Sequence, residues 1–434
     1  MSNYKVSSCK SLKGEIVVPG DKSISHRSIM FGSLANGETS ISGFLEGEDS
    51  LATLNAFKSM GVRIEGPSKG KVQIKGVGMN GLQPASQPLD LGNSGTSMRL
   101  MAGLLSSQNF ESTLMGDKSL SGRPMNRVIK PLAEMGAKIE SQNGKAPLVI
   151  HGNTNLFGIK YDMPMASAQV KSCLLLAGMY ASGQTRITEP GITRDHTERM
   201  LSTFLYPIDV GGNSVSISGG GNLTSCELDI PADISSAAFF MVAASISENA
   251  DLLLKNVGIN PTRTGVIEIL RLMGAKIELL NERKFGSEPV ADIHVSSSQL
   301  HGVKIPENLV PLAIDEFPVI FVAAACAEGE TVLTGAEELR VKESDRIQAM
   351  ADGLIEIGID AVATDDGLII NGGEIRGGVV ESHDDHRIAM AFSVAGIRSK
   401  NEIVIKNINN VATSFPNFLP LAQEIGMHIS IFDT

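Results

Sequence analysis

The stretches MGVRIE (residues 60–65), MGAKIE (residues 135–140) and MGAKIE (residues 273–278) are three near copies of one pattern. Fainter copies are YPIDV at 206–210, IGIDA at 357–361 and IGMHI at 425–429. In each copy an apolar, helix-like segment ends in a tight turn and runs into a short alternating strand. The copies recur about every 70 residues, which is typical of a repeated small α/β unit rather than of a common solenoid repeat. The chain is therefore predicted to be an α/β protein built from six repeats.

Working outward from these turns, each repeat contains two kinds of helix. The first helices have almost entirely apolar interiors, so they must be buried on every side; we expect them to begin near Lys22, Ser94, Ser167, Ile234, Glu316 and Asp385. The second helices alternate apolar and charged residues at helical spacing and should lie on the surface. Clear examples are expected at Pro124–Met135, Thr264–Met273 and Glu343–Ile357.

The number of repeats predicts two lobes. Three buried helices with their surrounding elements would form a domain of about 200 residues, so six repeats should form two such domains. We expect residues 21–231 to form the first lobe and residues 1–20 plus 232–434 to form the second, with hinges near 19–21 and 230–233. Gly14–Val18 is expected to be a strand that pairs with the sheet of the last repeat.

The composition excludes several classes of protein. The net charge of −11 argues against broad binding to nucleic acids or anionic membranes, although it allows a local basic pocket. The four cysteines form no CxxC pair, which favours free thiols in a reducing compartment. The start of the chain lacks the features of a signal or transit peptide, and the longest apolar runs are too short to span a bilayer. We expect a soluble cytoplasmic protein.

Polar and charged residues gather where the helices begin. The first helix opens with DKSISHR at residues 21–27, which adds a lysine, an arginine and two hydroxyls to free N–H groups and a positive helix end. This combination predicts an anion site. A capped helix with surface cations is the alternative, and recurrence along the chain argues against it.

Other helix starts carry related motifs, each with different residues. They are NSGTSMR at 93–99, SGRP at 121–124, SAQVK at 167–171, TRDH at 193–196, RVKESDR at 340–346 and DDHR at 384–387. The fourth repeat, with ADISS at 232–236, is the poorest in charge and is expected to be mainly structural. Without a partner cluster of His or Cys, the DDH triplet is not expected to bind a metal.

Together these motifs predict a cationic cleft in an acidic protein. Its cations would be Lys22, Arg27, Arg123, Arg194, Lys342, Arg346 and Arg387. So many cations require several anionic groups, which indicates phosphorylated and carboxylated small molecules as ligands. Asp315, at the start of the fifth repeat, and Glu343, in the motif at 340–346, could move protons, although structural ion pairing would also explain Glu343.

Five of these motifs resemble the 5-enolpyruvylshikimate-3-phosphate synthase family. They are DKSISHR, LGNSGT at 91–96, SGRPM at 121–125, RVKESDR and DHR at 385–387, and they follow the family's order over nearly the whole chain. The resemblance implies a two-lobed, inside-out α/β barrel with six βαβαββ-like repeats, three per lobe, that closes around its substrates.

The resemblance also implies the reaction and the residues that perform it. The reaction is transfer of the enolpyruvyl group of phosphoenolpyruvate to the 5-hydroxyl of shikimate 3-phosphate in aromatic amino-acid (chorismate) biosynthesis, with release of phosphate and with no metal or organic cofactor.

Shikimate 3-phosphate would be held by Lys22, Ser23, Arg27, Ser167, Ala168, Gln169, Arg194, Asp315 and Lys342. Phosphoenolpyruvate would be held by Lys22, Gly95, Arg123, Gln169, Arg346 and Arg387. Asp315 would take the hydroxyl proton, while Glu343 and Lys22 would transfer protons at the methylene carbon. We expect a monomer that acts on these two small molecules, without nucleic-acid or membrane partners.

Three positions depart from the commonest family pattern. Thr413 stands where many members have a lysine, Ala168 where many have a serine, and Glu338 where some have an asparagine. These departures resemble the family's second, glyphosate-tolerant branch, so glyphosate tolerance is a hypothesis for this chain.

Two other proteins remain as alternatives. The UDP-N-acetylglucosamine enolpyruvyl transferases share the fold and the donor, but they carry a cysteine shortly before an Arg-Pro pair, where this chain has Lys118. A sliding clamp on nucleic acid also has sixfold α/β pseudosymmetry, but it needs scattered cations facing a central hole. Here the cations cluster with hydroxyls, an amide and carboxylates, which suits one compact ligand.

Overall fold

A computed structural model describes residues 2–152 and 155–433, and its contacts divide the chain into two units. The first unit comprises Gly20–Ile230 and the short segment Phe285–Glu288. The second unit comprises the chain up to Pro19, Pro231–Lys284 and the chain from Pro289 onward. The chain therefore passes between the units next to the two hinge regions that the sequence suggests.

The segment Phe285–Glu288 differs from the expected division, which placed it in the second lobe. It is the turn between two long strands, and its contacts lie in the first unit. The Arg199 guanidinium donates to the Ser287 carbonyl at 2.9 Å, and His196 Nδ1 lies 2.8 Å from the buried Glu288 carboxylate. The alternation of apolar and polar residues along the two strands does not indicate that the turn between them contacts Arg199 and His196.

The first unit contains one four-stranded sheet for each of its three repeats. The sheet orders are β16-β4-β6-β5, β7-β8-β10-β9 and β11-β12-β14-β13. In each sheet the first pair is parallel and the other pairs are antiparallel. The strands are β4 (Glu38–Ser42), β5 (Arg63–Ser68), β6 (Lys71–Lys75), β7 (Leu89–Asp90), β8 (Ser112–Met115), β9 (Ile139–Gln142), β10 (Lys145–Ile150), β11 (Lys160–Asp162), β12 (Gln184–Thr188), β13 (Ile208–Gly211), β14 (Ser214–Ser218) and β16 (Glu227–Asp229), with a small parallel pair of β3 (Ala35–Asn36) and β15 (Leu223–Thr224).

The second unit repeats this plan. Its sheets have the orders β18-β19-β17-β2, β20-β22-β21 and β23-β24-β1-β25. The middle sheet has three strands, and a parallel bridge from Lys304 to Val332 stands where the others have an edge strand. The strands are β1 (Ser2–Ser7), β2 (Ser11–Ile16), β17 (Asn249–Gly258), β18 (Lys276–Phe285), β19 (Glu288–Ser296), β20 (Glu330–Leu333), β21 (Asp360–Thr364), β22 (Gly367–Asn371), β23 (Gly378–Glu381), β24 (Ile403–Lys406) and β25 (His428–Asp433).

The N-terminal segment forms two strands in two different sheets. The strand that pairs with the last repeat is β1, which lies antiparallel to both β24 and β25. The strand β2, which contains most of the expected Gly14–Val18 strand, instead pairs parallel to β17 of the fourth repeat. The expected partner of Gly14–Val18 was therefore wrong, because the alternating pattern marks a strand without identifying its sheet.

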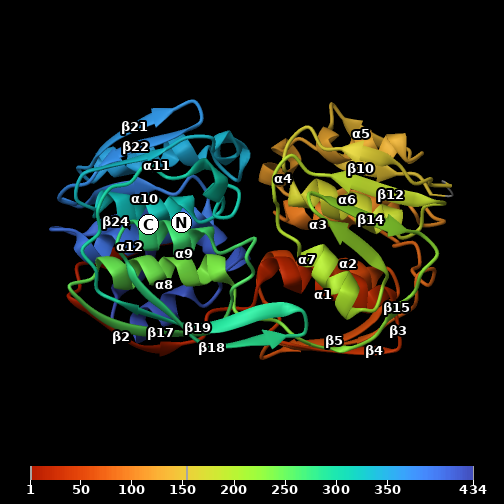
Figure 1. Ribbon diagram of the computed structural model, residues 1–434, viewed down its shortest axis with the longest axis horizontal. Helices are drawn as coiled ribbons and strands as arrows, with labels where there is room; N and C mark the ends of the chain where they lie inside the picture. The colour runs from red at the N-terminus through yellow and green to blue at the C-terminus, as the bar shows by residue number, and fades with distance from the viewer. Residues whose placement is uncertain (1, 153–154, 434) are drawn as a thin grey trace. The chain divides into compact units, whose positions relative to one another are not determined.

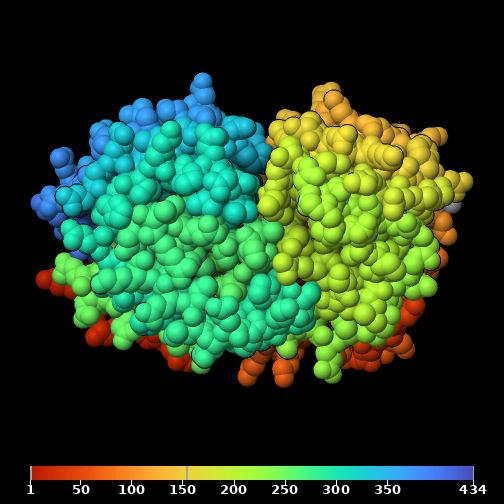
Figure 2. Space-filling model, viewed as in Figure 1, coloured from red at the N-terminus to blue at the C-terminus, as the bar shows by residue number. Residues whose placement is uncertain are grey.

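Six apolar helices form the centres of the two units, as their composition predicts. They are α1 (Lys22–Leu34), α3 (Gly95–Leu105) and α6 (Ala168–Gly178) in the first unit, and α8 (Ile234–Ile246), α10 (Phe317–Ala325) and α12 (His386–Ala395) in the second. Every residue of α8 and α10 is buried. In the second unit these helices lie between the sheets that contain β21 and β17 (Figure 1), and Figure 2 shows how side chains fill the space between the ribbons.

Other helices cover these centres. They are α2 (Glu48–Ser59), α4 (Lys118–Gly122), α5 (Asn126–Glu134), α7 (His196–Thr203), α9 (Gly265–Leu272), α11 (Arg346–Glu356) and α13 (Phe418–Glu424), with 3-10 turns η1 (Glu307–Leu309), η2 (Glu337–Val341), η3 (Gly396–Arg398) and η4 (Asn409–Thr413). The second helices predicted from the sequence correspond to α5, α9 and α11, each with one buried face.

Each unit has its own hydrophobic core, and the two clusters share no residue. The four cysteines are free; Cys9 and Cys173 are buried, while Cys226 and Cys326 are partly exposed. Within the part of the chain that the structure describes, no helix is long and apolar enough to cross a membrane.

The turn that defines the repeats has the same geometry at different residues. At Gly61 the backbone is left-handed (φ 87°), and the next amide donates back across the helix end from Val62 to Phe57 at 3.1 Å. In the third repeat the equivalent residue is Leu205 (φ 60°), and Tyr206 donates to Leu201 at 2.8 Å. This position favours glycine, because a Cβ is strained in the left-handed region.

We predict that Leu205→Gly stabilises the protein. Leu205 is 70% exposed, so its side chain contributes little packing, while its left-handed backbone is strained. The free energy of unfolding should rise by about 0.5–1 kcal/mol, measured by urea denaturation. The matched change Gly61→Ala, which adds a Cβ at the equivalent turn, should lower it. Destabilisation by Leu205→Gly would contradict this account of the turn.

Candidate active site

Most of the buried helices begin with a side chain that caps their free N–H groups. Asp21, Ser94, Ser167, Asp233 and Asp385 each accept a hydrogen bond from a backbone amide in the first turn of their helix. Glu316, which precedes α10, makes no such bond. The caps fix where each apolar helix starts, and they place the flanking polar residues at the positive helix ends.

Gly95 lies against two guanidinium groups in the first unit. A Cβ at this position would stand 3.0 Å from Nη1 of Arg99 and 3.2 Å from Nη1 of Arg123. Arg99 Nη1 donates to Gln169 Oε1 at 2.5 Å, and Gln169 Nε2 donates to Thr96 at 3.1 Å. All five residues are predicted ligands or lie in their motifs. The start of α3 and the start of α6 are therefore joined in one cluster that combines two guanidinium groups with an amide.

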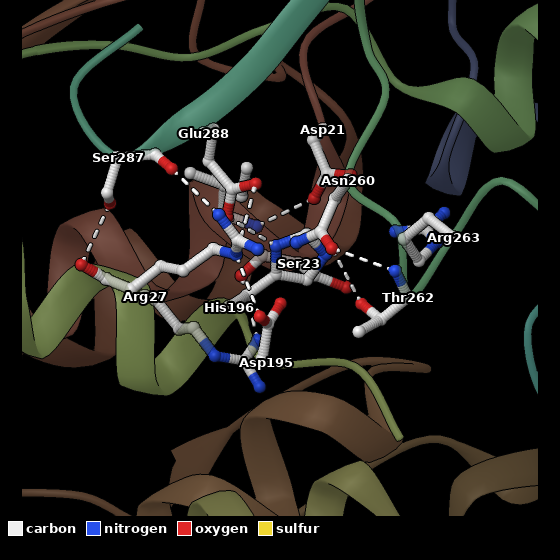
Figure 3. A network of polar contacts seen from close by, with 12 residues as sticks. Asp21, Ser23, Arg27, Asp195, His196, Asn260, Thr262, Arg263, Ser287 and Glu288 are labelled. Carbon is white, nitrogen blue, oxygen red and sulfur yellow. Dashed lines mark hydrogen bonds and ion pairs between the residues drawn. The ribbon is translucent and has the colours of Figure 1, made fainter. Parts of the chain in front are cut away.

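Arg27 forms a second cationic group in the same unit. It lies one turn into α1 and is buried, with Nη1 donating to the Ser23 carbonyl at 2.9 Å. Burial lowers the pKa of Arg27 to about 10, although nearby acidic groups, Glu198 first, oppose this effect. Figure 3 shows Ser23 and Arg27 with the neighbouring side chains of His196 and Glu288.

The remaining predicted residues of the first unit also lie at helix starts. Lys22 is the first residue of α1 and forms an ion pair with the buried Asp49 carboxylate of α2. Ser167 is the cap of α6 and Ala168 is its first residue. Arg194 lies two residues before α7, close enough to Arg27 to lower the pKa of that guanidinium.

A buried lysine joins α6 to α7 beneath these residues. Lys171 Nζ lies 2.7 Å from the carboxylates of both Glu189 and Glu198. Burial lowers the pKa of Lys171, but the two carboxylates outweigh this effect and the net pKa is raised. Lys171 is therefore a structural cation rather than one that faces a ligand.

The second unit brings Arg346 together with four other predicted residues. The Arg346 guanidinium donates to Asp385 at 2.8 Å through Nε and to Glu343 at 2.6 Å through Nη2, and its Nη1 lies 3.5 Å from Asp315. Lys342 Nζ is 3.6 Å from the same Asp315 carboxylate, and Arg387 Nη1 donates to the Asp315 carbonyl at 2.9 Å.

Burial separates this cluster into a fixed part and an accessible part. The side chains of Arg346 and Asp385 are 1% and 0% exposed, whereas those of Lys342, Asp315 and Glu343 are 21%, 17% and 20% exposed. Burial lowers the pKa of Arg346 and raises that of Asp385. Their mutual attraction outweighs both effects, so the pKa of Arg346 is raised and that of Asp385 is lowered. The Arg346–Asp385 pair is therefore buried and fixed, whereas the side chains of Lys342, Asp315 and Glu343 are accessible to a ligand.

Sequence reasoning missed several residues of these clusters. Arg99 lies inside the quoted motif at 93–99, four residues after Gly95, and helical spacing could have identified it. Asp49 contacts Lys22, and Thr197 accepts a hydrogen bond from Arg27 Nε at 2.7 Å. Neither residue carries a local signal, because its partner comes from a distant part of the chain. His26, in the same helix start as Lys22 and Arg27, is buried, and its Nδ1 lies 2.7 Å from Thr53 Oγ1.

The fourth repeat is more polar than its sequence suggested. Arg263, just before α9, is buried and donates to Ser235 at 2.6 Å and to Asp233 at 3.2 Å. Ser235 also donates to the buried Glu316 carboxylate. These groups bind one another, which supports the interpretation of this repeat as mainly structural.

Each unit thus presents cations at the starts of buried helices, and the second unit adds two accessible carboxylates. These features define an α/β enzyme that acts on anionic small molecules.

Comparison with known proteins identifies the family. Residues 6–421 match the family described as EPSP synthase (3-phosphoshikimate 1-carboxyvinyltransferase). The 3-phosphoshikimate 1-carboxyvinyltransferase of Methylococcus capsulatus is 62% identical over 421 residues, covering 97% of this chain and 96% of the relative. That of Hydrogenovibrio crunogenus is 60% identical and covers 99% of each chain. A solved EPSP synthase from Acinetobacter baumannii superposes with a TM-score of 0.90 at 57% identity and covers 100% of each chain. The chain belongs to the EPSP synthase family, and it has that family's two-lobed inside-out α/β fold.

We predict that Asp385→Asn lowers the free energy of unfolding by about 3 kcal/mol, because it leaves the buried Arg346 charge without its main partner. The pKa of Asp385 is lowered in the folded state, so its contribution is present above the unfolded pKa of about 3.9 and is lost as the pH falls through the folded pKa. Urea denaturation at pH 7 should show the loss, and its dependence on acid pH should be weaker in the variant.

The neighbouring Asp384 provides a matched control. Its side chain is exposed and its backbone is left-handed, which asparagine tolerates, so Asp384→Asn should change the stability by less than about 0.5 kcal/mol. Equal effects of the two changes would contradict a special role for the buried pair.

Proposed function

We propose that this protein transfers the enolpyruvyl group of phosphoenolpyruvate to the 5-hydroxyl of shikimate 3-phosphate and releases phosphate, in chorismate biosynthesis. The observation that supports this best is the cluster of Asp315, Lys342, Glu343, Arg346 and Arg387, which combines cations for anionic groups with carboxylates for proton transfer. Membership of the EPSP synthase family supports the same reaction. In this proposal, residues of both units act in one reaction.

The acceptor, shikimate 3-phosphate, would be held mainly by the first unit. Its proposed ligands are Lys22, Ser23, Arg27, Ser167, Ala168, Gln169 and Arg194, together with Asp315 and Lys342 of the second unit. Hydroxyls at the starts of α1 and α6 lie beside amide groups that no helix bond uses, so both the side chains and the backbone can donate to oxygen atoms.

The donor, phosphoenolpyruvate, would be held by arginines of both units. Its proposed ligands are Lys22, Gly95, Arg123, Gln169, Arg346 and Arg387. A guanidinium can donate two parallel hydrogen bonds to a carboxylate or phosphate, which suits the two anionic groups of this substrate. The missing side chain at Gly95 leaves room beside Arg123 for the ligand to approach.

The proposed chemistry has two stages. In the first, Asp315 accepts the proton of the 5-hydroxyl, the oxygen bonds to C2 of phosphoenolpyruvate, and Glu343 with Lys22 delivers a proton to the methylene carbon. In the second, the bond from C2 to the phosphate oxygen breaks, phosphate leaves with the proton that Asp315 accepted, and the methyl group returns a proton to Glu343 with Lys22 as the double bond re-forms. Arg346 donates to Glu343 at 2.6 Å, which would hold this carboxylate in place through both stages.

Further expectations from the sequence remain part of this proposal. They are a monomeric, cytoplasmic enzyme without nucleic-acid or membrane partners, lobes that correspond to the two units with hinges at 19–21 and 230–233, and glyphosate tolerance. The last is motivated by Thr413, which here donates to the Asn410 carbonyl at 2.7 Å.

We predict that the wild-type protein releases phosphate only when both substrates are present and that Lys22→Met reduces kcat at least about 100-fold. The loss follows because the variant removes the cation proposed to contact both substrates and to assist proton transfer. Phosphate release can be followed with a coupled assay. Lys58→Met, which changes an exposed lysine of α2, is the matched control and should retain activity.

Absence of phosphate release from the wild type would overturn the proposed function, as would release that requires UDP-N-acetylglucosamine as the acceptor. Full activity of Lys22→Met would leave the reaction in place but remove the role of Lys22.

We predict that Gly95→Ala raises the KM for phosphoenolpyruvate about tenfold or more, while the KM for shikimate 3-phosphate changes less than about twofold. The added methyl group would stand 3.0 Å from Arg99 Nη1 and 3.2 Å from Arg123 Nη1, so the guanidiniums must move. Gly122→Ala is the control, since a Cβ there meets nothing within 4 Å. A selective rise in the KM for shikimate 3-phosphate would contradict the assignment of Gly95.

A further inference from the structure

Two buried hydroxyl groups hold the guanidinium of Arg27. Its Nε donates to Thr197 Oγ1 at 2.7 Å and its Nη2 donates to Ser172 Oγ at 2.8 Å. The hydroxyl of Thr197 in turn donates to Ser172 Oγ at 2.7 Å. All three residues are nearly inaccessible, with 4% of Arg27, 1% of Thr197 and 1% of Ser172 exposed. The three side chains therefore form a closed, hydrogen-bonded triangle.

This triangle determines which edge of the guanidinium is available to a ligand. Arginine has five N–H groups, and three of those of Arg27 are bound to Thr197, Ser172 and the Ser23 carbonyl. Among the described residues, this leaves one N–H on each terminal nitrogen for another acceptor. When the two terminal nitrogens of a guanidinium each donate one N–H in parallel, the group can bind two oxygens of a carboxylate or phosphate.

The hydroxyl pair is itself fixed by the packing of α6 on α7. Ser172 follows Lys171 on α6, and Thr197 precedes Glu198 on α7. The Lys171–Glu198 ion pair, at 2.7 Å, joins the same two helices beside the Thr197–Ser172 hydrogen bond. Two adjacent links, one charged and one neutral, set the position of α7 relative to α6.

We propose that Thr197 and Ser172 are positioning residues for the acceptor substrate: they orient Arg27 so that its two outer N–H groups bind an anionic group of shikimate 3-phosphate. This inference rests on the proposed function. Neither residue contacts the reacting atoms in this role, and neither was among the residues predicted from the sequence.

Neutral hydroxyl groups are better suited to orient Arg27 for ligand binding than carboxylates would be. A carboxylate in place of the hydroxyls would neutralise Arg27 and compete with the ligand for its donors. The hydroxyls accept hydrogen bonds without a formal charge, so the guanidinium keeps its attraction for an anion.

The test compares Thr197→Val with Thr197→Ser. Valine has the shape of threonine without the hydroxyl, so Nε of Arg27 would lose its acceptor. We expect the dissociation constant for shikimate 3-phosphate, measured by calorimetry without phosphoenolpyruvate, to rise about tenfold, since the lost hydrogen bond involves a charged group. The KM for phosphoenolpyruvate should change less than about twofold. Serine restores the acceptor and should recover affinity to within about threefold of wild type, and Ser172→Ala should weaken binding in the same direction.

Thr185→Val is the matched control for folding. Thr185 lies in β12 of the same unit, is buried, and its hydroxyl has no hydrogen-bond partner among the described residues. This variant should bind shikimate 3-phosphate as the wild type does. Urea midpoints of all variants would show whether Thr197→Val remains folded under the assay conditions, and Thr197→Ser provides the second test if it does not.

A double-variant cycle tests whether Thr197 acts through Arg27. Lysine lacks the Nε–H donor, so adding Thr197→Val to Arg27→Lys should weaken binding less than about twofold further. An additional tenfold loss in that background would overturn the proposal, as would unchanged affinity in Thr197→Val alone or failure of serine to restore it. Absence of activity in the wild type would instead overturn the proposed function, so the two failures are distinguishable.

Discussion

Helices that are buried on nearly every face need complete cover from water, and six such helices determine the rest of this structure. Each unit meets this requirement by packing three of them together beneath sheets and amphipathic helices. Their side chains leave no exposed polar face, so polar chemistry is confined to the helix ends. The N-terminal ends have free amides and a positive dipole, and there the chain places its capping residues and most of its predicted ligands. The location of the site is thus a consequence of how the core is built.

The buried cations of the site are stabilised in two different ways. Arg346 is neutralised by the fully buried Asp385, and their attraction raises the pKa of the guanidinium and lowers that of the carboxyl. Arg27 has hydroxyl anchors instead, and burial lowers its pKa to about 10. The carboxylate of Asp385 fixes Arg346 beside Glu343, whereas Arg27 is fixed by two hydroxyl groups that carry no formal charge. The same side chain can therefore play different roles at two helix starts.

The sequence predicted the elements better than their partners. The starts of the buried helices were predicted to within about one residue, because capping residues such as Ser94, Ser167 and Asp385 are local signals. Partners depend on the whole fold. The strand β2 was placed in the wrong sheet for this reason, and Asp49 and Thr197 were not recognised as contacts of Lys22 and Arg27. Motifs identified the ligand candidates that a helix start presents, but not the buried groups that hold them.

The fourth repeat shows what decides whether a helix start can bind a ligand. It has the ingredients of the others: a cap in Asp233, a hydroxyl in Ser235 and an arginine in Arg263. Here, however, the arginine donates to the cap and the hydroxyl, and the hydroxyl donates to Glu316. In the sixth repeat the cap Asp385 binds Arg346 of the preceding repeat, while Arg387 extends to the backbone of Asp315. Divergence between the repeats therefore works by changing which partner each charged group contacts.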